Sequence, residues 1–442
     1  MNTDSRPNNP SEPAKLRRDV GLFGAMMMGL GSIVGTGVFV SIGIAAGITG
    51  PSVVLAILVA GLVATFNGLS SAQLAAAHPV SGGTYEYGYR WLTPSMGFTA
   101  GWMFLCAKSA SAATAALGFA GYALQLFQFD HDDWIVPLAI GAVVATTLLL
   151  LGGIRRSNWT NIAIVSTTLI ALASLVIAGL PVAWREGSSN MTPFFASDVP
   201  AIATRQFLEA CALMFVAYTG YGRIATLGEE VHNPRRTIPR AIIATLLVSS
   251  LLYAIVGGIA VAAAGTDVWS STSQQTAPLQ LVANHLNSPL VAKLVAIGAV
   301  TAMLGVLLNL ILGLSRVVFA MGRRGDLPRG LATVSSQNST PSGAVIAVGI
   351  GVGTLALVGD VKTTWSFSAF TVLVYYALTN LAATRLTANE RLFSPIVPWL
   401  GLASCLGLAF WVQPKIWIIG LSLIAVGLVF QQCMKRSDTS AS

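Results

Sequence analysis

Charged side chains are scarce in this sequence. Asp, Glu, Lys and Arg make up 10% of the 442 residues, whereas 54% are hydrophobic, and the mean hydropathy is +0.71. Soluble domains carry about 25% charged residues, so these few charges cannot cover the surface of a soluble protein of this size. They suffice if most of the surface faces lipid. The composition therefore predicts a single bundle of membrane helices without a soluble domain.

The residue types that build metal centres, disulfides and catalytic groups are also few and scattered. The four cysteines form no CxxC pair, and we interpret them as small buried apolar side chains. The four histidines all fall in predicted loops without metal-ligand spacing, and no nucleophile stands beside a base. The sequence thus predicts no enzyme activity, no cofactor and no metal site. A channel is disfavoured because no repeated pore-lining filter is evident.

Twelve long apolar runs follow one another along the chain. Each is close to the roughly 20 mainly apolar residues that a lipid-spanning helix needs, and the runs are too long and unbroken for barrel strands. We therefore expect an all-α membrane protein with twelve transmembrane helices. The expected spans are 21–46, 52–77, 96–126, 134–152, 160–183, 206–228, 241–264, 290–320, 343–359, 364–384, 396–412 and 416–433.

Lys and Arg divide unevenly between the two sides of these spans. If the N-terminus lies inside, the inside segments hold most of the 25 basic residues. This positive-inside pattern predicts a multi-pass protein of the cell membrane with two cytoplasmic tails, 1–18 and 435–442. The longest loops, near 184–205 and 265–289, would be external connectors. The net charge of +8 then reflects topology, and it gives no reason to expect nucleic acid as a partner.

Four glycines interrupt the first predicted span, at positions 29, 31, 35 and 37. Each glycine weakens a helix by about 1 kcal/mol relative to Ala. In hydrocarbon, freed backbone groups are tolerated only where protein or a water-filled cavity satisfies them. Two interpretations stay open. The glycines allow close helix packing through the Gly31-xxx-Gly35 spacing, or the helix unwinds and its bare amides bind an anion.

The sixth span is interrupted in the same way, by Gly220 and Gly222. Spans one and six are five apart, so they run in opposite directions. This pattern predicts a 5+5 inverted repeat with a midplane site between discontinuous helices 1 and 6. Half-helix ends attract anions and cations without charged side chains, which would suit a zwitterionic amino acid. The repeats would comprise residues 19–184 and 185–392, followed by two C-terminal helices in 393–434.

Four segments carry a resemblance to a known family. They are GSIVGTGVF at 31–39, PVSGGTY at 79–85, EEVHNPRRTIPR at 229–240, and Arg316 followed by MGRRGDLP at 321–328. Over about residues 20–430 the chain resembles permeases of the amino acid–polyamine–organocation superfamily. The resemblance implies the leucine-transporter fold and secondary active transport of amino acids by alternating access, without an obligatory partner subunit.

The resemblance also implies a substrate-binding role for each matching position in the two interrupted helices. Backbone amides would bind the substrate carboxylate, and backbone carbonyls its ammonium. An aromatic lid would come from one of three side chains, with ordinary packing as the alternative for each. The carboxylate group is Gly35, Thr36 and Gly37; the ammonium group is Ile33, Val216, Ala217, Tyr218 and Thr219; the lid candidates are Phe215, Tyr218 and Tyr221.

One lysine, Lys108, lies within the third span, where it costs roughly 2.5–3.5 kcal/mol on insertion scales. Three interpretations of this lysine stay open. It would bind an anionic group of the substrate, it would carry the coupling proton because burial disfavours its charged form, or it would tether helices by bonding backbone carbonyls. Proton-dependent relatives place a lysine in helix five, where this chain has Thr168, so Lys108 would replace it. Sodium coupling is the alternative, with Thr301 and Ser315 as candidate ligands.

The expected substrate follows from the charges inside the spans. No Asp or Glu is expected deep within a span, and Gly222 stands where several relatives carry a carboxylate. A site with a lysine and no acid disfavours dicationic substrates. We therefore expect proton-coupled transport of neutral amino acids, with acidic ones second. An exchanger, and a nontransporting amino acid sensor, are the alternatives.

Charged residues after the sixth span suggest a cytoplasmic gate. Arg223 would pair with Glu229 or Glu230. The remaining charges would form ion pairs that hold the gate closed, or they would only anchor the loop to the inside. The gate residues are Glu229, Glu230, Arg235, Arg236 and Arg240.

Overall fold

The computed structural model describes residues 20–80, 82–129, 132–153, 158–225, 231–272, 276–334 and 341–440. Within these ranges the chain is helical without a β-strand, apart from an isolated bridge between Val20 and Val231. Nine helical stretches of the described residues are long and apolar enough to cross a membrane, and two shorter helices are also apolar. The predicted all-α membrane class is confirmed.

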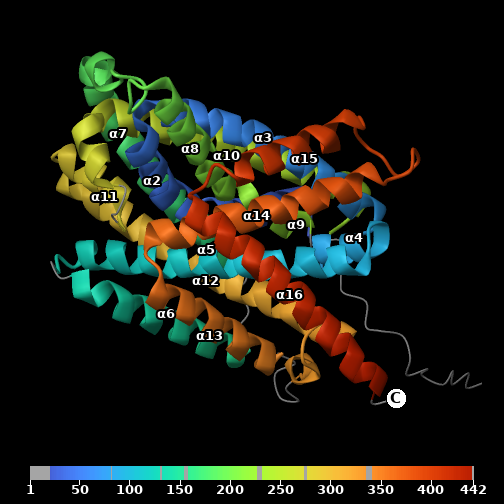
Figure 1. Cartoon of the computed structure of the whole chain (residues 1–442). Coiled ribbons are helices and arrows are strands. Elements are labelled where there is room, and N and C mark those ends of the chain that lie inside the picture. The colour runs from blue at the N-terminus through green and yellow to red at the C-terminus, as the bar shows by residue number, and fades with distance from the viewer. Residues whose placement is uncertain are drawn as a thin grey trace, which may run out of the picture.

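Every run predicted as a span overlaps one helix or, for the first and sixth runs, a broken pair of helices (Figure 1). The helices are α1 Leu22–Ile33, η1 Gly37–Ser41, α2 Ile42–Thr49, η2 Gly50–Ser52, α3 Val53–Ala77, α4 Thr84–Trp91, α5 Pro94–Leu126, η3 Asp132–Trp134, α6 Ile135–Leu151, α7 Asn158–Asn190, α8 Pro200–Tyr218, η4 Thr219–Tyr221, α9 Gly222–Ala225, α10 Pro234–Thr272, α11 Pro278–His285, α12 Pro289–Arg324, η5 Arg329–Ala332, α13 Ser342–Val358, α14 Val361–Thr384, α15 Ile396–Ala409 and α16 Pro414–Ser440.

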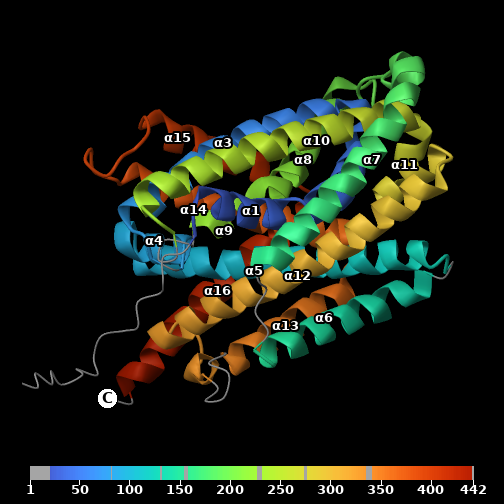
Figure 2. The same cartoon turned by 180° about the vertical axis from the view of Figure 1, so that it is seen from behind.

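The helices form one bundle around α1, α5, α12 and α14. Helices α5 and α12 run along its length in contact with each other, and α6 lies beside α13 on one flank (Figures 1 and 2). Helices α3, α8 and α10 pack together on the other side, and α1 lies against α7, α10 and α12. The broken helices therefore sit inside the bundle.

Large apolar side chains cover the outward faces of the peripheral helices. Leu148 on α6 is 62% exposed, Ile177 on α7 is 71% exposed, and Leu247 on α10 is 70% exposed. Soluble monomers rarely expose wide apolar surfaces. Such faces fit a lipid environment, and they explain why hydropathy alone locates the helices.

The two segments predicted as loops, near 184–205 and 265–289, are largely helical where the structure describes them, so the loop prediction is wrong, and their external location stays a prediction. Helix α7 continues to Asn190, and α8 already begins at Pro200. Helix α10 continues past a kink at Gly265, where φ is 72°, and α11 occupies Pro278–His285. Hydropathy marks only the lipid-facing part of a helix, whereas polar turns beyond it stay helical. Proline at the first helical position starts both α8 and α11.

Helix α8 also carries a buried acidic side chain. Glu209 lies in the third turn of this helix, and its side chain is 8% exposed. This acidic residue is buried near the start of the predicted span 206–228, so it does not contradict the prediction that none lies deep within a span.

Helix 1 breaks at the predicted glycines. Helix α1 ends at Ile33, and Val34 has φ −82° and ψ 87°, outside helical geometry. The chain then enters the π-helical turn η1 and continues as α2. The Tyr122 hydroxyl on α5 donates a 2.8 Å hydrogen bond to the carbonyl of Phe39, which compensates part of the disturbed backbone.

Helix 6 also breaks, in a different form. Helix α8 ends at Tyr218, a 3₁₀ turn spans Thr219–Tyr221, and α9 is a short helix at Gly222–Ala225. The Thr219 side chain donates to the carbonyl of Val216 at 2.8 Å, which ties down the end of α8.

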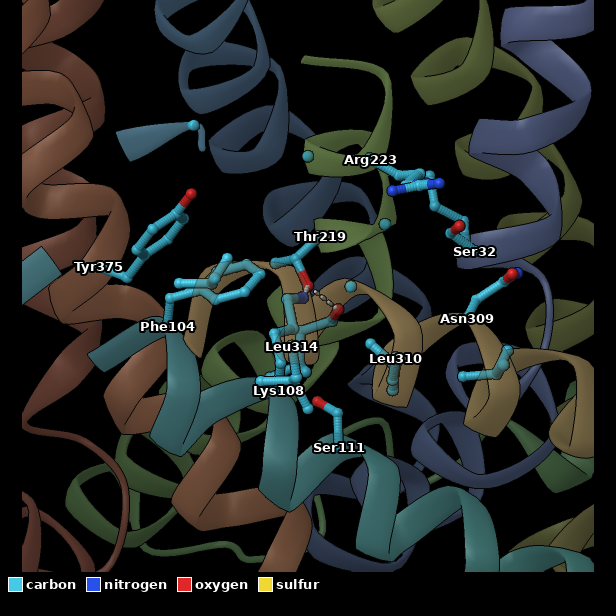
Figure 3. Close-up of a pocket in the computed structure, with 18 of the residues that line it drawn as sticks. Ser32, Phe104, Lys108, Ser111, Thr219, Arg223, Asn309, Leu310, Leu314 and Tyr375 are labelled. Atoms are coloured by element: carbon cyan, nitrogen blue, oxygen red, sulfur yellow. Dashed lines mark hydrogen bonds between the residues drawn. The ribbon is translucent and has the colours of Figure 1, made fainter. Parts of the chain in front are cut away.

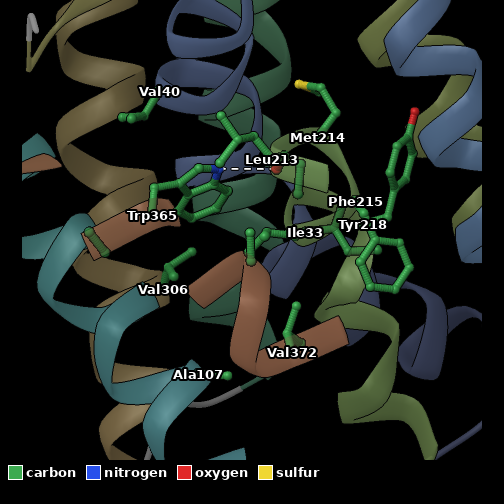
Figure 4. Packing of buried hydrophobic residues seen from close by; sticks show 14 of the residues in the cluster. Ile33, Val40, Ala107, Leu213, Met214, Phe215, Tyr218, Val306, Trp365 and Val372 are labelled. Atoms are coloured by element: carbon green, nitrogen blue, oxygen red, sulfur yellow. Dashed lines mark hydrogen bonds between the residues drawn. The ribbon is translucent and has the colours of Figure 1, made fainter. Parts of the chain in front are cut away.

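A packed layer joins α8 to α14 on one side of the breaks (Figure 4). Trp365 on α14 is buried, and its indole N–H donates to the carbonyl of Leu213 at 3.1 Å. Ile33, Phe215 and Val372 belong to the same buried apolar cluster. This layer separates the breaks from the end of the bundle at which α8 begins.

Candidate functional site

A cavity of about 180 Å³ lies between the two broken helices and helices α5, α12 and α14 (Figure 3). This volume is more than ten times the roughly 10–15 Å³ that one water needs. The cavity therefore has room for a small organic molecule. Seven of the residues predicted to bind substrate or to serve coupling line it: Ile33, Thr36, Gly37, Lys108, Val216, Ala217 and Thr219.

Lys108 connects α5 to the break in helix 6. Its ammonium donates a 2.8 Å hydrogen bond to the hydroxyl of Thr219, and both side chains line the cavity. An ammonium has three donors, and Thr219 accepts one. The lysine therefore binds a hydroxyl, where the tether interpretation had expected backbone carbonyls.

The helix 1 side of the cavity presents a hydroxyl with no partner. Thr36 is 4% exposed, and its Oγ1 has no hydrogen-bond partner among the described residues. A buried polar group costs free energy unless it is hydrogen-bonded. Because Thr36 lines the cavity, a bound molecule can supply the missing partner.

Tyr253 on α10 holds the two breaks together. Its hydroxyl lies 2.7 Å from the carbonyl of Ile33 and 3.1 Å from that of Ala217. The Ile33 carbonyl also accepts from the Gly35 amide at 3.0 Å. A carbonyl has two lone pairs. In this conformation, Tyr253 therefore occupies an oxygen that was predicted to bind the substrate ammonium. No local sequence pattern marks this tyrosine, which sits in an ordinary apolar run.

Two glycines allow the backbones of the broken helices to approach each other. A Cβ at Gly220 would lie 2.5 Å from the carbonyl carbon and oxygen of Ser32. A Cβ at Gly37 would lie 2.4 Å from the Tyr253 hydroxyl and 3.0 Å from Cβ of Ala217. The glycines thus serve close packing here, and the break they permit also opens the cavity.

The aromatic side chains at the cavity differ from the three predicted ones. Phe104 of α5 and Trp365, Tyr375 and Tyr376 of α14 line it. Phe215 and Tyr221 instead pack against the ring of Tyr376, with centroids at 5.7 and 5.4 Å.

Tyr218, the third lid candidate, and Gly35 of helix 1 also lie outside the described cavity lining. The Tyr218 hydroxyl donates to the carbonyl of Ile57 at 3.1 Å. Gly35 faces Val306, whose Cγ2 would lie 2.6 Å from a Cβ at this position. Neither Tyr218 nor Gly35 belongs to the described cavity lining.

The charged side chains in the described part of the cavity lining are basic. Lys108, Arg223 and Arg316 line the cavity, and no acidic residue does so within the described part of the chain. The cavity lining extends as far as Gly82 and Gly83, the two residues directly before α4. The cavity therefore favours a ligand that carries at least one negative charge.

The predicted gate is only partly described. Glu229 and Glu230 lie outside the described residues, so their pairing with Arg223 stays a prediction. The other three gate residues, Arg235, Arg236 and Arg240, are exposed on the first turns of α10.

A different ionic cluster lies near α4. Arg324 donates to Glu86 at 2.7 Å, and its guanidinium lies 4.0 Å from the ring centroid of Tyr89. Asp326 is 2% exposed and accepts 2.6 Å hydrogen bonds from Tyr85 and Tyr89. Burial, and after it the hydrogen bond to Asp326, raise the pKa of both phenols above its usual range.

Helix α16 joins this cluster. Gln431 donates from Nε2 to Asp326 at 3.2 Å and to the Tyr89 hydroxyl at 3.3 Å. Two motifs of the family resemblance supply Tyr85 and Asp326, but nothing in the sequence signalled that they meet. The cluster joins α4, the end of α12 and α16.

The two sodium candidates lie far apart on one helix. Thr301 and Ser315 lie fourteen residues apart on α12, which is about 21 Å along a helix. Each hydroxyl donates to a carbonyl of its own helix, Thr301 at 2.9 Å and Ser315 at 2.9 Å. Thr168 likewise bonds the carbonyl of Ile164. Thr301 and Ser315 are therefore too far apart to bind the same ion, and a sodium role for either one stays a prediction.

Apolar helices that break around a central cavity define a multi-pass membrane protein built to bind a small molecule within the bundle. The family model for amino acid permeases matches residues 24–442. The chain belongs to the amino acid permease family.

Several curated proteins are similar over nearly their whole length. An uncharacterized transporter of Mycobacterium tuberculosis is 38% identical over 96% of this chain and 93% of its own. The branched-chain amino acid permease BcaP of Bacillus subtilis is 29% identical over 96% of this chain and 94% of its own. The methylthioribose transporter of Bacillus subtilis is 26% identical over 94% of this chain and 93% of its own.

Proposed function

We propose that the protein is a secondary active transporter that moves neutral amino acids across the cell membrane by alternating access, coupled to protons. The observation that carries this proposal is the central cavity, which both broken helices line and which contains Lys108 and no described acid. Twelve spans in two inverted repeats, with both termini in the cytoplasm, belong to the same proposal.

The substrate carboxylate would bind where the cavity is richest in donors. The Thr36 hydroxyl lacks a partner, and Lys108 has donors beyond the one it gives to Thr219. The ammonium would bind carbonyls at the breaks, among them Ile33 once Tyr253 releases it. Phe104, Trp365 and Tyr375 would contact an apolar side chain.

Charge supports a neutral substrate over a cationic one. A second positive charge on the substrate would lie close to the Lys108 ammonium, and no acidic side chain lines the described part of the cavity. Two relatives that are named branched-chain amino acid permeases fit the same choice. An acidic amino acid is the second candidate, because Lys108 has donors beyond the one it gives to Thr219 and these would bind an extra carboxylate.

The central cavity is open towards one side of the membrane and closed towards the other. The cavity reaches Gly82 and Gly83, on the side that the positive-inside pattern makes cytoplasmic. On the other side, Trp365 bonded to Leu213 closes it. These features support an inward-facing state of an alternating-access cycle.

Uptake into proteoliposomes tests the proposal. We expect saturable uptake of radiolabelled leucine that a pH gradient drives, that unlabelled neutral amino acids inhibit, and that excess arginine leaves unchanged. Replacing sodium with choline should have no effect. Uptake that requires sodium, or only one-for-one exchange without net accumulation, would replace proton coupling with the alternative mechanisms. No uptake of any of the twenty amino acids, despite binding, would indicate a sensor.

A further inference from the structure

A second pocket, of about 550 Å³, lies at the end of the bundle opposite Gly82 and Gly83. It is formed where α2 ends and where α8, α14 and α16 begin. Nothing in the family comparison assigns it a role.

Two acceptor oxygens in this pocket have no hydrogen-bond partner among the described residues. They are Oε1 of Gln206 and Oε1 of Glu209, and both atoms are buried. The two residues are three positions apart on α8, so their side chains lie on the same face of the helix. Leaving a buried carboxylate oxygen without a donor is costly. A primary ammonium, with three N–H donors, fits two adjacent acceptors.

Three cationic side chains line the same pocket. Arg205 lies in the second turn of α8, Lys362 is the second residue of α14, and Lys415 is the second residue of α16. The start of α16 adds the positive end of a helix dipole, whereas the start of α14 is already capped by the Asp360 carboxylate. An anionic group is therefore favoured beside the ammonium site, and an α-amino acid carries both groups on one carbon.

The pocket lies in line with the central cavity. Helix α8 lines both, with Glu209 at the pocket and Val216 at the cavity, about 10 Å further along the helix. Helix α14 also lines both, through Lys362 and Trp365. The hydrogen bond from Trp365 to Leu213 lies between the two spaces.

We propose that this pocket is an outer docking site, in which Gln206 and Glu209 bind the ammonium of a zwitterionic amino acid and Arg205, Lys362 and Lys415 its carboxylate, before the molecule passes Trp365. The proposal rests on the proposed transport function and adds a second binding site to it. The docking site captures substrate and takes no part in the steps that follow capture.

The test measures initial uptake of leucine into proteoliposomes with the pocket outside. Glu209→Gln keeps the shape of the side chain and removes its charge. We expect KM to rise about tenfold, or about 1.4 kcal/mol, with Vmax unchanged. Lys362→Gln should raise KM in the same way. The matched control is Glu186→Gln, which removes an exposed carboxylate from the end of α7 at the same end of the bundle.

Substrate analogues separate the two halves of the site. The 2-hydroxy acid analogue of leucine lacks the ammonium. Its inhibition constant for leucine uptake should therefore be the same in the wild type and in Glu209→Gln. An unchanged KM for leucine in both Glu209→Gln and Lys362→Gln, with wild-type uptake intact, would overturn the docking site. Absence of leucine uptake by the wild type would instead overturn the proposed function itself.

A lipid headgroup offers the same chemistry, because phosphatidylethanolamine also joins an ammonium to an anion. The measurements are therefore made in liposomes of phosphatidylcholine alone and of phosphatidylcholine with phosphatidylethanolamine. The same rise in KM in both supports amino acid docking. A Glu209→Gln effect that occurs only with phosphatidylethanolamine assigns the pocket to lipid and contradicts the proposal. If Glu209→Gln does not fold, as judged by its melting temperature, Lys362→Gln decides alone.

Discussion

The ammonium of Lys108 lies 2.8 Å from the hydroxyl of Thr219, so the lysine of α5 is fastened to the turn at which helix 6 breaks. This bond joins an element of the cavity wall to an element that alternating access would move. A proton that leaves Lys108 would weaken the bond at the same time, which would couple protonation to the position of the break.

Lys108→Ala should therefore abolish amino acid accumulation driven by a pH gradient and retain counterflow exchange. Both are measured with radiolabelled substrate in proteoliposomes. The control is Thr219→Val, which removes the acceptor of this bond and leaves the lysine in place. If Lys108→Ala accumulates substrate on a pH gradient to the wild-type level, Lys108 does not carry the coupling proton. Its remaining role is then to tether α5 to Thr219.

Gly220→Ala should destabilise the protein and stop transport. The new methyl would lie 2.5 Å from backbone atoms of Ser32, which cannot rotate away as a side chain would. Overpacking of this kind costs about 1–3 kcal/mol, so the melting temperature in detergent should fall.

The matched variant for this test is Gly313→Ala. Gly313 also lines the cavity, but a Cβ there meets nothing within 4 Å. It lies inside α12, where Ala is favoured over Gly by up to about 1 kcal/mol. Its melting temperature should stay level or rise. Equal losses in the two variants would show that the approach of Gly220 to Ser32 is unimportant.

Tyr253→Phe should bind substrate more tightly than the wild type does. The hydroxyl occupies the carbonyl of Ile33, which a substrate ammonium would have to take over. Removing a competing hydrogen bond worth about 1 kcal/mol corresponds to about fivefold in the dissociation constant. The substrate-induced rise in melting temperature should increase, while the substrate-free protein melts earlier. A smaller substrate-induced rise would show that Ile33 does not bind the ammonium.

Asp326→Ala should detach α16 from the rest of the bundle. The change removes the acceptor of the Tyr85 and Tyr89 hydroxyls and one of the acceptors of the Gln431 amide. Each unsatisfied buried group costs about 1–3 kcal/mol. We expect a lower melting temperature and faster proteolysis of the C-terminal helix. Glu186→Ala, at an exposed position, is the control, and equal behaviour of the two variants would contradict a structural role for Asp326.

Hydrophobicity was sufficient to predict the helices, because lipid-facing surfaces require continuous apolar runs. Glycine density likewise predicted where helices 1 and 6 break, since no other residue leaves so much backbone unshielded. Helical turns beyond the lipid, such as those of α7 up to Asn190, were missed because their polar composition also suits loops.

The site was only half predictable for a related reason. Backbone positions such as Gly37 and Thr219 are marked by local sequence, and they do line the cavity. Tyr253 and Trp365 come from distant helices, and their contacts depend on how those helices pack. Periodicity cannot show which of several buried aromatics faces the cavity, so Phe215 was a reasonable candidate and Trp365 was not foreseen.

The hydrogen bond between Trp365 and Leu213 also bears on water. Opening this layer separates an indole N–H from a carbonyl in a region with no other described partner for the indole. If no water replaced the bond, separating the indole N–H from the carbonyl would cost about 1–3 kcal/mol for each group left unsatisfied. Water that enters behind Trp365 would replace the lost bond. Hydration of this layer and outward opening are thus a single event, and osmotic stress that withdraws water should slow the cycle at this step.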